Sequence, residues 1–170
     1  VAETEKTILD RLDYRSGYSL YIGIPFCPTT CLYCSFTSYS LEANRSRVED
    51  YLDALIKELA FVSDTMSQKR LDTVYIGGGT PTTLNPSQLD RLLTELEALF
   101  DMKNVREFTV EAGRPDSVTR EKLRVLKAHG VGRISINPQT MNDKTLEIIG
   151  RRHSAGQVEE AFRLAREEWF

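Results

Sequence analysis

The sequence contains no long apolar run and no large excess of charge of either sign. No stretch approaches the roughly 20 apolar residues of a membrane-spanning helix, and the first residues lack the apolar core of a signal peptide. A net charge of −3 provides no basic surface that would favour nucleic acid or an anionic membrane. We therefore expect a cytoplasmic globular protein that uses neither nucleic acid nor a membrane as a partner.

Cysteine and histidine are scarce, and the positions of the few that occur are informative. The three cysteines, Cys27, Cys31 and Cys34, lie within eight residues, which is a poor framework for disulfide bonds and favours a metal or cluster site. The two histidines, His129 and His153, lie far along the chain, whereas structural zinc needs four ligands. His129 is predicted to end a helix and is assigned no chemistry.

Four short segments rich in β-branched and aromatic residues predict strands, and each ends at Gly, Pro or Asn. They are residues 19–24, 73–76, 107–111 and 133–136. All but the third are almost continuously apolar, as expected of parallel strands that are covered on both faces.

Helical patterns lie between and after these strands. Apolar residues recur at three- and four-residue spacing over 48–59 and 89–96. Asn85 and Ser154 each stand three residues before a glutamine, a capping-box pattern that predicts a helix start. Further helices are expected over 117–128, before Gly130, and over 142–149. The alternation predicts an α/β fold built from right-handed βαβ units around a parallel sheet of about four strands.

The cysteines follow the first predicted strand with a C-x3-C-x2-C spacing. Thiolates bind iron tightly. A cubane held by three cysteines leaves one iron without a protein ligand, and another molecule can chelate that iron. Ligand sites of βα folds lie at the carboxyl ends of the strands, where this loop falls. The spacing therefore favours a [4Fe–4S] cluster, with structural zinc or a chance grouping of cysteines as the alternatives.

The stretch YIGIPFCPTTCLYCSF, residues 21–36, resembles the radical S-adenosylmethionine (SAM) superfamily. More narrowly, it resembles the branch of oxygen-independent coproporphyrinogen III oxidases and dehydrogenases, which also contains heme chaperones and heme-degrading methyltransferases. The resemblance extends to about Arg152, and the stretches EAGRPD and RISINPQT are most similar to the bacterial dehydrogenase-like subgroup.

This resemblance implies a partial radical SAM barrel and a specific chemistry. A [4Fe–4S] cluster receives an electron from a donor such as flavodoxin or ferredoxin and cleaves SAM to a 5′-deoxyadenosyl radical. The implied reaction is the oxidative decarboxylation of coproporphyrinogen III to protoporphyrinogen IX in haem biosynthesis. A heme chaperone that binds SAM and haem, and a radical SAM methyltransferase, are the alternatives.

A glycine-rich turn, GGGTPT, follows the second predicted strand. Glycines at a strand end allow backbone to approach a ligand closely, and the spacing is not that of a dinucleotide fingerprint. A tight turn without a ligand is the alternative. The resemblance implies that Gly78, Gly79 and Thr80 line the methionine part of SAM.

Other candidate cofactor-binding residues come from the resemblance. They are Tyr21, Phe26, Glu111, Gln139 and Arg151. A carboxylate can accept hydrogen bonds from hydroxyl or ammonium groups, an amide suits hydroxyls, and a guanidinium can bind a carboxylate. The alternatives are a solvated strand-end charge, a solvated arginine pair at 151–152 and ordinary packing of the two aromatic residues. Which basic side chain of 151–153 points inward is left open.

Two positions differ from the oxidase pattern: Phe36 stands where a fourth cysteine is usual, and Gly23 where a histidine is common. These differences concern the substrate and not the cluster. We expect residues 1–17 to be an extension and 18–170 the N-terminal part of a radical SAM core with an open sheet. The open edge and the apolar stripe of the last helix would favour association, and this stretch alone would be inactive.

Overall fold

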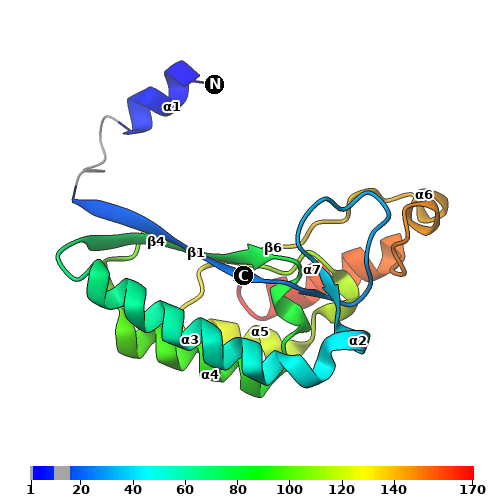
Figure 1. Ribbon diagram of the computed structural model, residues 1–170. Helices are drawn as coiled ribbons and strands as arrows, with labels where there is room; N and C mark the ends of the chain where they lie inside the picture. Colours follow the sequence, from blue (N-terminus) through cyan, green and yellow to red (C-terminus); the bar gives the residue numbers. More distant parts are fainter. Residues whose placement is uncertain (1, 10–15) are drawn as a thin grey trace.

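The computed structural model describes residues 2–9 and 16–170. Four parallel strands form one sheet in the order β1 (Gly17–Ile24), β4 (Arg70–Gly78), β5 (Glu107–Glu111) and β6 (Arg133–Ser135). This arrangement confirms the predicted α/β fold with an open parallel sheet (Figure 1). The predicted extension lies partly outside the described residues, and its boundary at residue 17 stays a prediction.

The longer helices that connect the strands lie on one side of the sheet, as Figure 1 shows. They are α3 (Val48–Thr65), α4 (Pro86–Leu99) and α5 (Arg120–Ala128), followed after β6 by α6 (Asp143–Ile148) and α7 (Ala155–Glu167). Both predicted capping boxes are present, at Asn85 and at Ser154. Helix α5 begins later than predicted because Thr119 is its N-cap and the preceding Pro115–Ser117 forms a 3₁₀ turn.

Several short elements were not predicted. They are α1 (Ala2–Leu9), β2 (Phe26–Cys27), β3 (Tyr39–Ser40), α2 (Leu41–Asn44), and 3₁₀ turns at Arg45–Arg47, Pro81–Thr83, Met102–Asn104 and Pro115–Ser117. Strands β2 and β3 pair in parallel, and the Tyr39 amide donates to the Pro25 carbonyl at 2.7 Å. This small pair joins the two ends of the loop that carries the cysteines.

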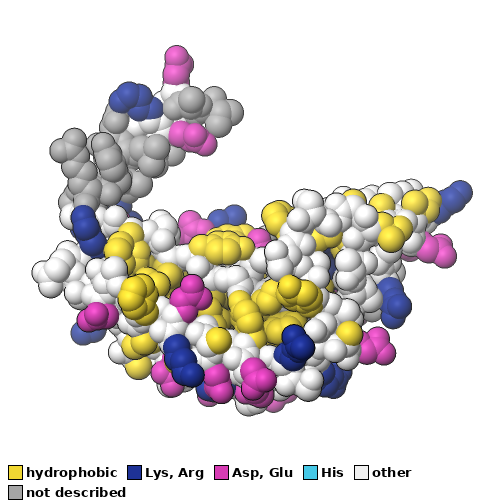
Figure 2. All heavy atoms as spheres, viewed as in Figure 1, with side chains coloured by type: hydrophobic (Ala, Val, Ile, Leu, Met, Phe, Trp, Pro, Cys, Tyr) yellow, Lys and Arg dark blue, Asp and Glu magenta, His cyan; other side chains and the backbone are white. Residues whose placement is uncertain are grey.

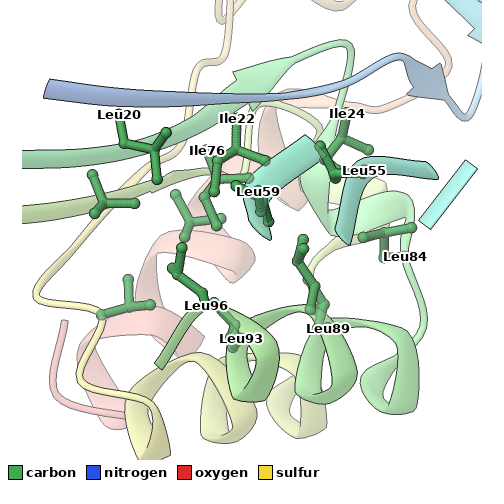
Figure 3. Packing of buried hydrophobic residues seen from close by; sticks show 14 of the residues in the cluster. Leu20, Ile22, Ile24, Leu55, Leu59, Ile76, Leu84, Leu89, Leu93 and Leu96 are labelled. Carbon is green, nitrogen blue, oxygen red and sulfur yellow. The ribbon is translucent and has the colours of Figure 1, made fainter. Parts of the chain in front are cut away.

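The core lies between the sheet and the helices. Ile22, Ile76 and Val110 occupy neighbouring register positions of three strands and are almost fully buried. They face leucines of α3 and α4, several of which Figure 3 labels. Burying each such side chain contributes about 1.5–3 kcal/mol, so this layer fixes the position of the sheet and of the loops at its ends.

The opposite face of the sheet is open, which corrects the expectation that both faces are covered. Tyr21 on β1 points away from the core and is 62% exposed, and Tyr75 is its register partner on β4. Since strand residues alternate between faces, Gly77 and Glu111 follow Tyr75 on this open face, where they reach the carboxyl ends of the strands.

Charged side chains gather on the outside of α3 and α4, while apolar side chains show between β1 and α3 (Figure 2). None of the described helices is long and apolar enough to cross a membrane.

Candidate functional site

The loops that follow β1, β4, β5 and β6 meet at the carboxyl edge of the sheet and enclose a cavity of ≈ 190 Å³. Eight of the predicted site residues line it: Cys31, Cys34, Gly78, Gly79, Thr80, Glu111, Gln139 and Arg151. Cys27, Tyr21 and Phe26 lie outside this lining. Residues far apart in sequence are thus brought to the one end of the sheet where ligands of βα folds bind.

The three cysteines are free thiols at half-buried positions. Cys27 Sγ lies 3.4 Å from the Thr80 hydroxyl oxygen, and the Ser38 hydroxyl donates to Cys34 Sγ at 3.9 Å. Burial raises the pKa of the Cys27 thiol, while the hydrogen bond between Cys27 and Thr80 and the charge of Arg114 act in the opposite direction. Cys27 therefore lies beside a hydroxyl of the turn after β4, and Cys34 beside a hydroxyl of the cysteine loop itself.

Within the described ranges, no three His, Cys, Asp or Glu side chains converge as the ligands of a single ion would. A cubane places each thiolate on a separate iron, so its ligands lie farther apart than those of one ion. The three soft sulfur donors on one loop match in type and number the donor set that a cluster with three protein ligands and one open iron requires. The residues present fit that group.

The glycine turn packs directly against the start of the cysteine loop. Gly78 has a φ of +102°, a backbone conformation that residues with a side chain rarely adopt. A Cβ on Gly79 would lie only 2.8 Å from the Phe26 carbonyl oxygen. The Gly79 amide donates to the Ile24 carbonyl and the Thr80 amide to the Phe26 carbonyl, both at 2.8 Å. These glycines therefore allow two loops to touch through their backbones, in addition to leaving room at the cavity.

Glu111 is held by a tyrosine that the sequence reasoning missed. The Tyr75 hydroxyl donates to Glu111 Oε1 at 2.6 Å. Burial, followed by this hydrogen bond, raises the pKa of Tyr75 to about 12, so the phenol keeps its proton at neutral pH. The Tyr21 ring stacks on Tyr75 with centroids 6.0 Å apart. Tyr75 alternates with the buried Val74 and Ile76, and this alternation is the signal that could have placed it beside the site.

Among the three basic residues after α6, Arg151 is the one that lines the site cavity. It donates to the Gly113 carbonyl at 3.0 Å and to the Tyr33 hydroxyl at 3.2 Å. Arg152 is exposed, and His153 is buried. Gln139 is exposed at the cavity and adopts a positive φ of 63°, and its backbone N–H donates to Asn137 Oδ1.

The Phe26 side chain lies in the core and not in the cavity. It is 3% exposed, and its ring meets the Tyr51 ring edge-on at 5.4 Å. Only its backbone faces the site, through the carbonyl that accepts from the Thr80 amide. The predicted contact of Tyr21 and Phe26 with the cofactor or cluster stays a prediction.

Arg114 lies in the EAGRPD stretch and is a second residue that the sequence reasoning missed. It is 2% exposed, and its Nη1 lies 3.9 Å from Cys31 Sγ. It also bonds Thr29 in the cysteine loop and Asp116 two residues later. A loop arginine gives no periodic signal, so only the chemical rarity of a fully buried arginine, visible in the structure, reveals it.

The Radical SAM superfamily model matches residues 21–170. The chain belongs to the radical SAM superfamily. The structure of coproporphyrinogen III oxidase (HemN) from Escherichia coli, described as a radical SAM enzyme, superposes with a TM-score of 0.80 at 27% identity. The superposed region covers 97% of this chain and 37% of the HemN chain.

Two curated relatives are similar at the sequence level. The chain is 44% identical over 152 residues to the oxygen-independent coproporphyrinogen-III oxidase-like protein HemZ of Bacillus subtilis, covering 88% of this chain and 30% of HemZ. It is 42% identical over 153 residues to the heme chaperone HemW of the same organism, covering 89% of this chain and 40% of HemW. The radical SAM chain therefore spans less than half the length of these relatives, one of which is oxidase-like and the other a chaperone.

Proposed function

We propose that Cys27, Cys31 and Cys34 hold a [4Fe–4S] cluster and that SAM binds beside it at the carboxyl edge of the sheet. When bound, these groups supply the one-electron cleavage of SAM to a 5′-deoxyadenosyl radical, which removes a hydrogen atom from the substrate. The observation that carries the proposal is the direct packing of the cysteine loop on the glycine turn at the mouth of a cavity lined by Glu111 and Arg151.

The chain's own residues orient the ligand in this proposal. Glu111, fixed by the Tyr75 hydroxyl, accepts a hydrogen bond from an ammonium or hydroxyl group. Arg151 carries donors suited to a carboxylate, and Gln139 offers an amide to hydroxyls. The ≈ 190 Å³ cavity is smaller than the roughly 300 Å³ lower limit of whole small-molecule pockets, so it holds only part of SAM. We assign the methionine end to the glycine turn and Arg151, and the ribose hydroxyls to Gln139.

For the substrate, we propose a porphyrinogen whose propionate groups undergo oxidative decarboxylation, as in the conversion of coproporphyrinogen III to protoporphyrinogen IX. The 44% identity to an oxidase-like protein and the similarity to HemN support this proposal. We further propose that a small cytoplasmic carrier, flavodoxin or ferredoxin, delivers the electron, and that the protein works in the cytoplasm.

A second candidate function is a heme chaperone that binds SAM and haem. The 42% identity to HemW favours it, and so does Phe36. This exposed side chain at the cavity stands where the oxidase pattern has a further cysteine.

The experiment that separates these functions uses dithionite, SAM and an anaerobically reconstituted protein in which residues 18–170 are part of a complete radical SAM barrel, because this stretch alone is expected to be inactive. We expect 5′-deoxyadenosine to form, and its amount to rise together with CO₂ when coproporphyrinogen III is added. Haem binding without porphyrinogen turnover would favour the chaperone. Absence of 5′-deoxyadenosine, with an intact cluster and bound SAM, would contradict the proposed chemistry.

A further inference from the structure

Arg114 brings a buried positive charge to the cysteine loop. Its five hydrogen-bond contacts match the five N–H donors of a guanidinium. Nε and Nη2 donate to the two carboxylate oxygens of Asp116 at 3.2 Å each. Nη2 also reaches Thr29 Oγ1 at 3.0 Å, and Nη1 reaches the Thr29 carbonyl at 3.3 Å and Cys31 Sγ at 3.9 Å.

Tethering of the loop does not by itself account for a cation at this place. Burying a charge costs several kcal/mol unless nearby charges compensate it. Asp116 compensates only in part, because its side chain is 24% exposed and water competes for it, whereas Arg114 is 2% exposed. A neutral amide could donate to the Thr29 oxygens. The positive charge on the side of the guanidinium that faces Cys31 is therefore compensated only if an anion lies there. Thiolates bound to a cluster would provide that anion.

Resting on the proposed function, we propose that Arg114 is a positioning residue that fixes the cysteine loop through Thr29 and raises the reduction potential of the cluster through its charge at Cys31. Hydrogen bonds to cluster sulfurs and nearby net charge set the potential of such clusters. Reduction makes the cluster one charge more negative, so a neighbouring cation favours it. Asp116, 3.2 Å from the guanidinium, partly offsets that charge.

Substitutions at the two partners should move the potential in opposite directions. Arg114→Gln keeps hydrogen-bond donors but removes the charge, so the ratio of reduced to oxidised cluster at a fixed potential should fall about tenfold, a shift of about 59 mV for one electron. Asp116→Asn leaves the arginine charge without its carboxylate and should raise the same ratio. A redox titration of the reconstituted protein, followed by electron paramagnetic resonance, measures both.

Three further variants separate charge from structure. Arg114→Lys keeps the positive charge but lacks the planar guanidinium with its five N–H donors. The reduction potential of the cluster in this variant should stay near that of the parent protein. Arg133→Gln removes an arginine that is paired with Glu107 at 3.0 Å but is 65% exposed, so its potential should not change. Should Arg114→Gln fail to fold because Asp116 is left unpaired, the double variant Arg114→Gln/Asp116→Asn should still lower the potential, since the guanidinium lies between the carboxylate and Cys31.

The outcomes are distinct. A parent-like potential in Arg114→Gln and in the Arg114→Gln/Asp116→Asn double variant, at full iron content, would overturn the inference and leave Arg114 as a structural tether. An equal shift in Arg114→Lys and Arg114→Gln would overturn it as well, because charge would not be the cause. If the parent protein binds no cluster, the proposed function fails first and this inference with it.

Discussion

At the residue scale, Tyr75 and Glu111 form a hydrogen-bonded pair on the open face of the sheet. Because the pKa of Tyr75 is raised to about 12, the phenol donates to the carboxylate over the whole neutral range. One oxygen of Glu111 is thereby occupied, and the side chain is fixed with its other oxygen available for a ligand. We regard Tyr75 as the group that orients Glu111.

Removing this carboxylate should weaken SAM binding without loss of the cluster. Glu111→Ala should raise the Kd for SAM about tenfold to a hundredfold, the effect of losing one good polar contact of about 1–3 kcal/mol. Tyr75→Phe should raise it less, since only the orientation of the acceptor is lost. Equilibrium binding to the reconstituted protein measures both.

Glu107→Ala is the matched control for that prediction. Glu107 lies at the other end of the same strand, where it is bonded to Thr109 and Arg133, so SAM affinity should not change. Equal affinities of the Glu111→Ala variant and the parent would mean that the ligand site lies elsewhere.

His153 is a second residue with a pH-dependent consequence. It is 3% exposed, and neither ring nitrogen makes a hydrogen bond of good geometry among the described residues. Burial, and then the charges of Arg151 and Arg114, lower its pKa below the ordinary 6.5, although the Pro138 carbonyl acts in the opposite direction. The folded protein therefore holds a neutral ring, while the unfolded chain takes up a proton as the pH falls below 6.5.

The stability of the parent should consequently fall as the pH decreases through about 6.5 toward the lowered pKa of His153. His153→Leu removes this proton uptake, so its free energy of unfolding should depend less on pH between about 7.5 and 5.5. Denaturant unfolding at the two pH values checks this. An identical pH dependence in both proteins would show that His153 is not buried as a neutral ring.

At the element scale, His129 connects the end of α5 to α4. Its ring nitrogens lie 3.0 Å from Asp90 and 3.0 Å from Glu97, both on α4. Burial lowers the pKa of the ring, but the hydrogen bonds to the two carboxylates outweigh it and raise the pKa above 6.5. The sequence predicted a residue at the helix end without chemistry; the pairing across two helices needed the three-dimensional packing.

Since the folded pKa is raised, the contribution of His129 is complete below 6.5 and is lost as the pH rises through the raised value. Both carboxylates are well exposed, so we expect about 0.5 kcal/mol. The unfolding free energy of His129→Gln should be lower than that of the parent near pH 5.5 and should approach it near about pH 8.5. A difference that grows with pH would contradict this pairing.

At the scale of the whole molecule, the order of strands and helices could be predicted because each element carries a local pattern. The capping boxes at Asn85 and Ser154 and the leucine stripe of α4 depend on neighbouring residues only, and all three are observed. The open face could not be predicted in this way. A strand such as β1, with Tyr21 among apolar residues, has nearly the same composition whether one face or both are covered.

The candidate site shows the same division. The cysteine spacing and the glycine turn are contiguous motifs, so the sequence alone could select them as candidates, and the structure brings them into backbone contact. The burial of Arg114 against Cys31, and the choice of Arg151 rather than Arg152 at the cavity, depend on how distant loops meet. No pattern along the chain contains that information.

The central claim is that Cys27, Cys31 and Cys34 hold a [4Fe–4S] cluster, and iron and sulfide analysis after anaerobic reconstitution tests it most directly. We expect about four irons and four sulfides per chain, with absorbance that dithionite bleaches. Each of Cys27→Ala, Cys31→Ala and Cys34→Ala should lose the cluster, because two protein thiolates hold a cubane poorly. One tightly bound zinc without iron–sulfur absorbance, or full iron content in any of these variants, would contradict the account.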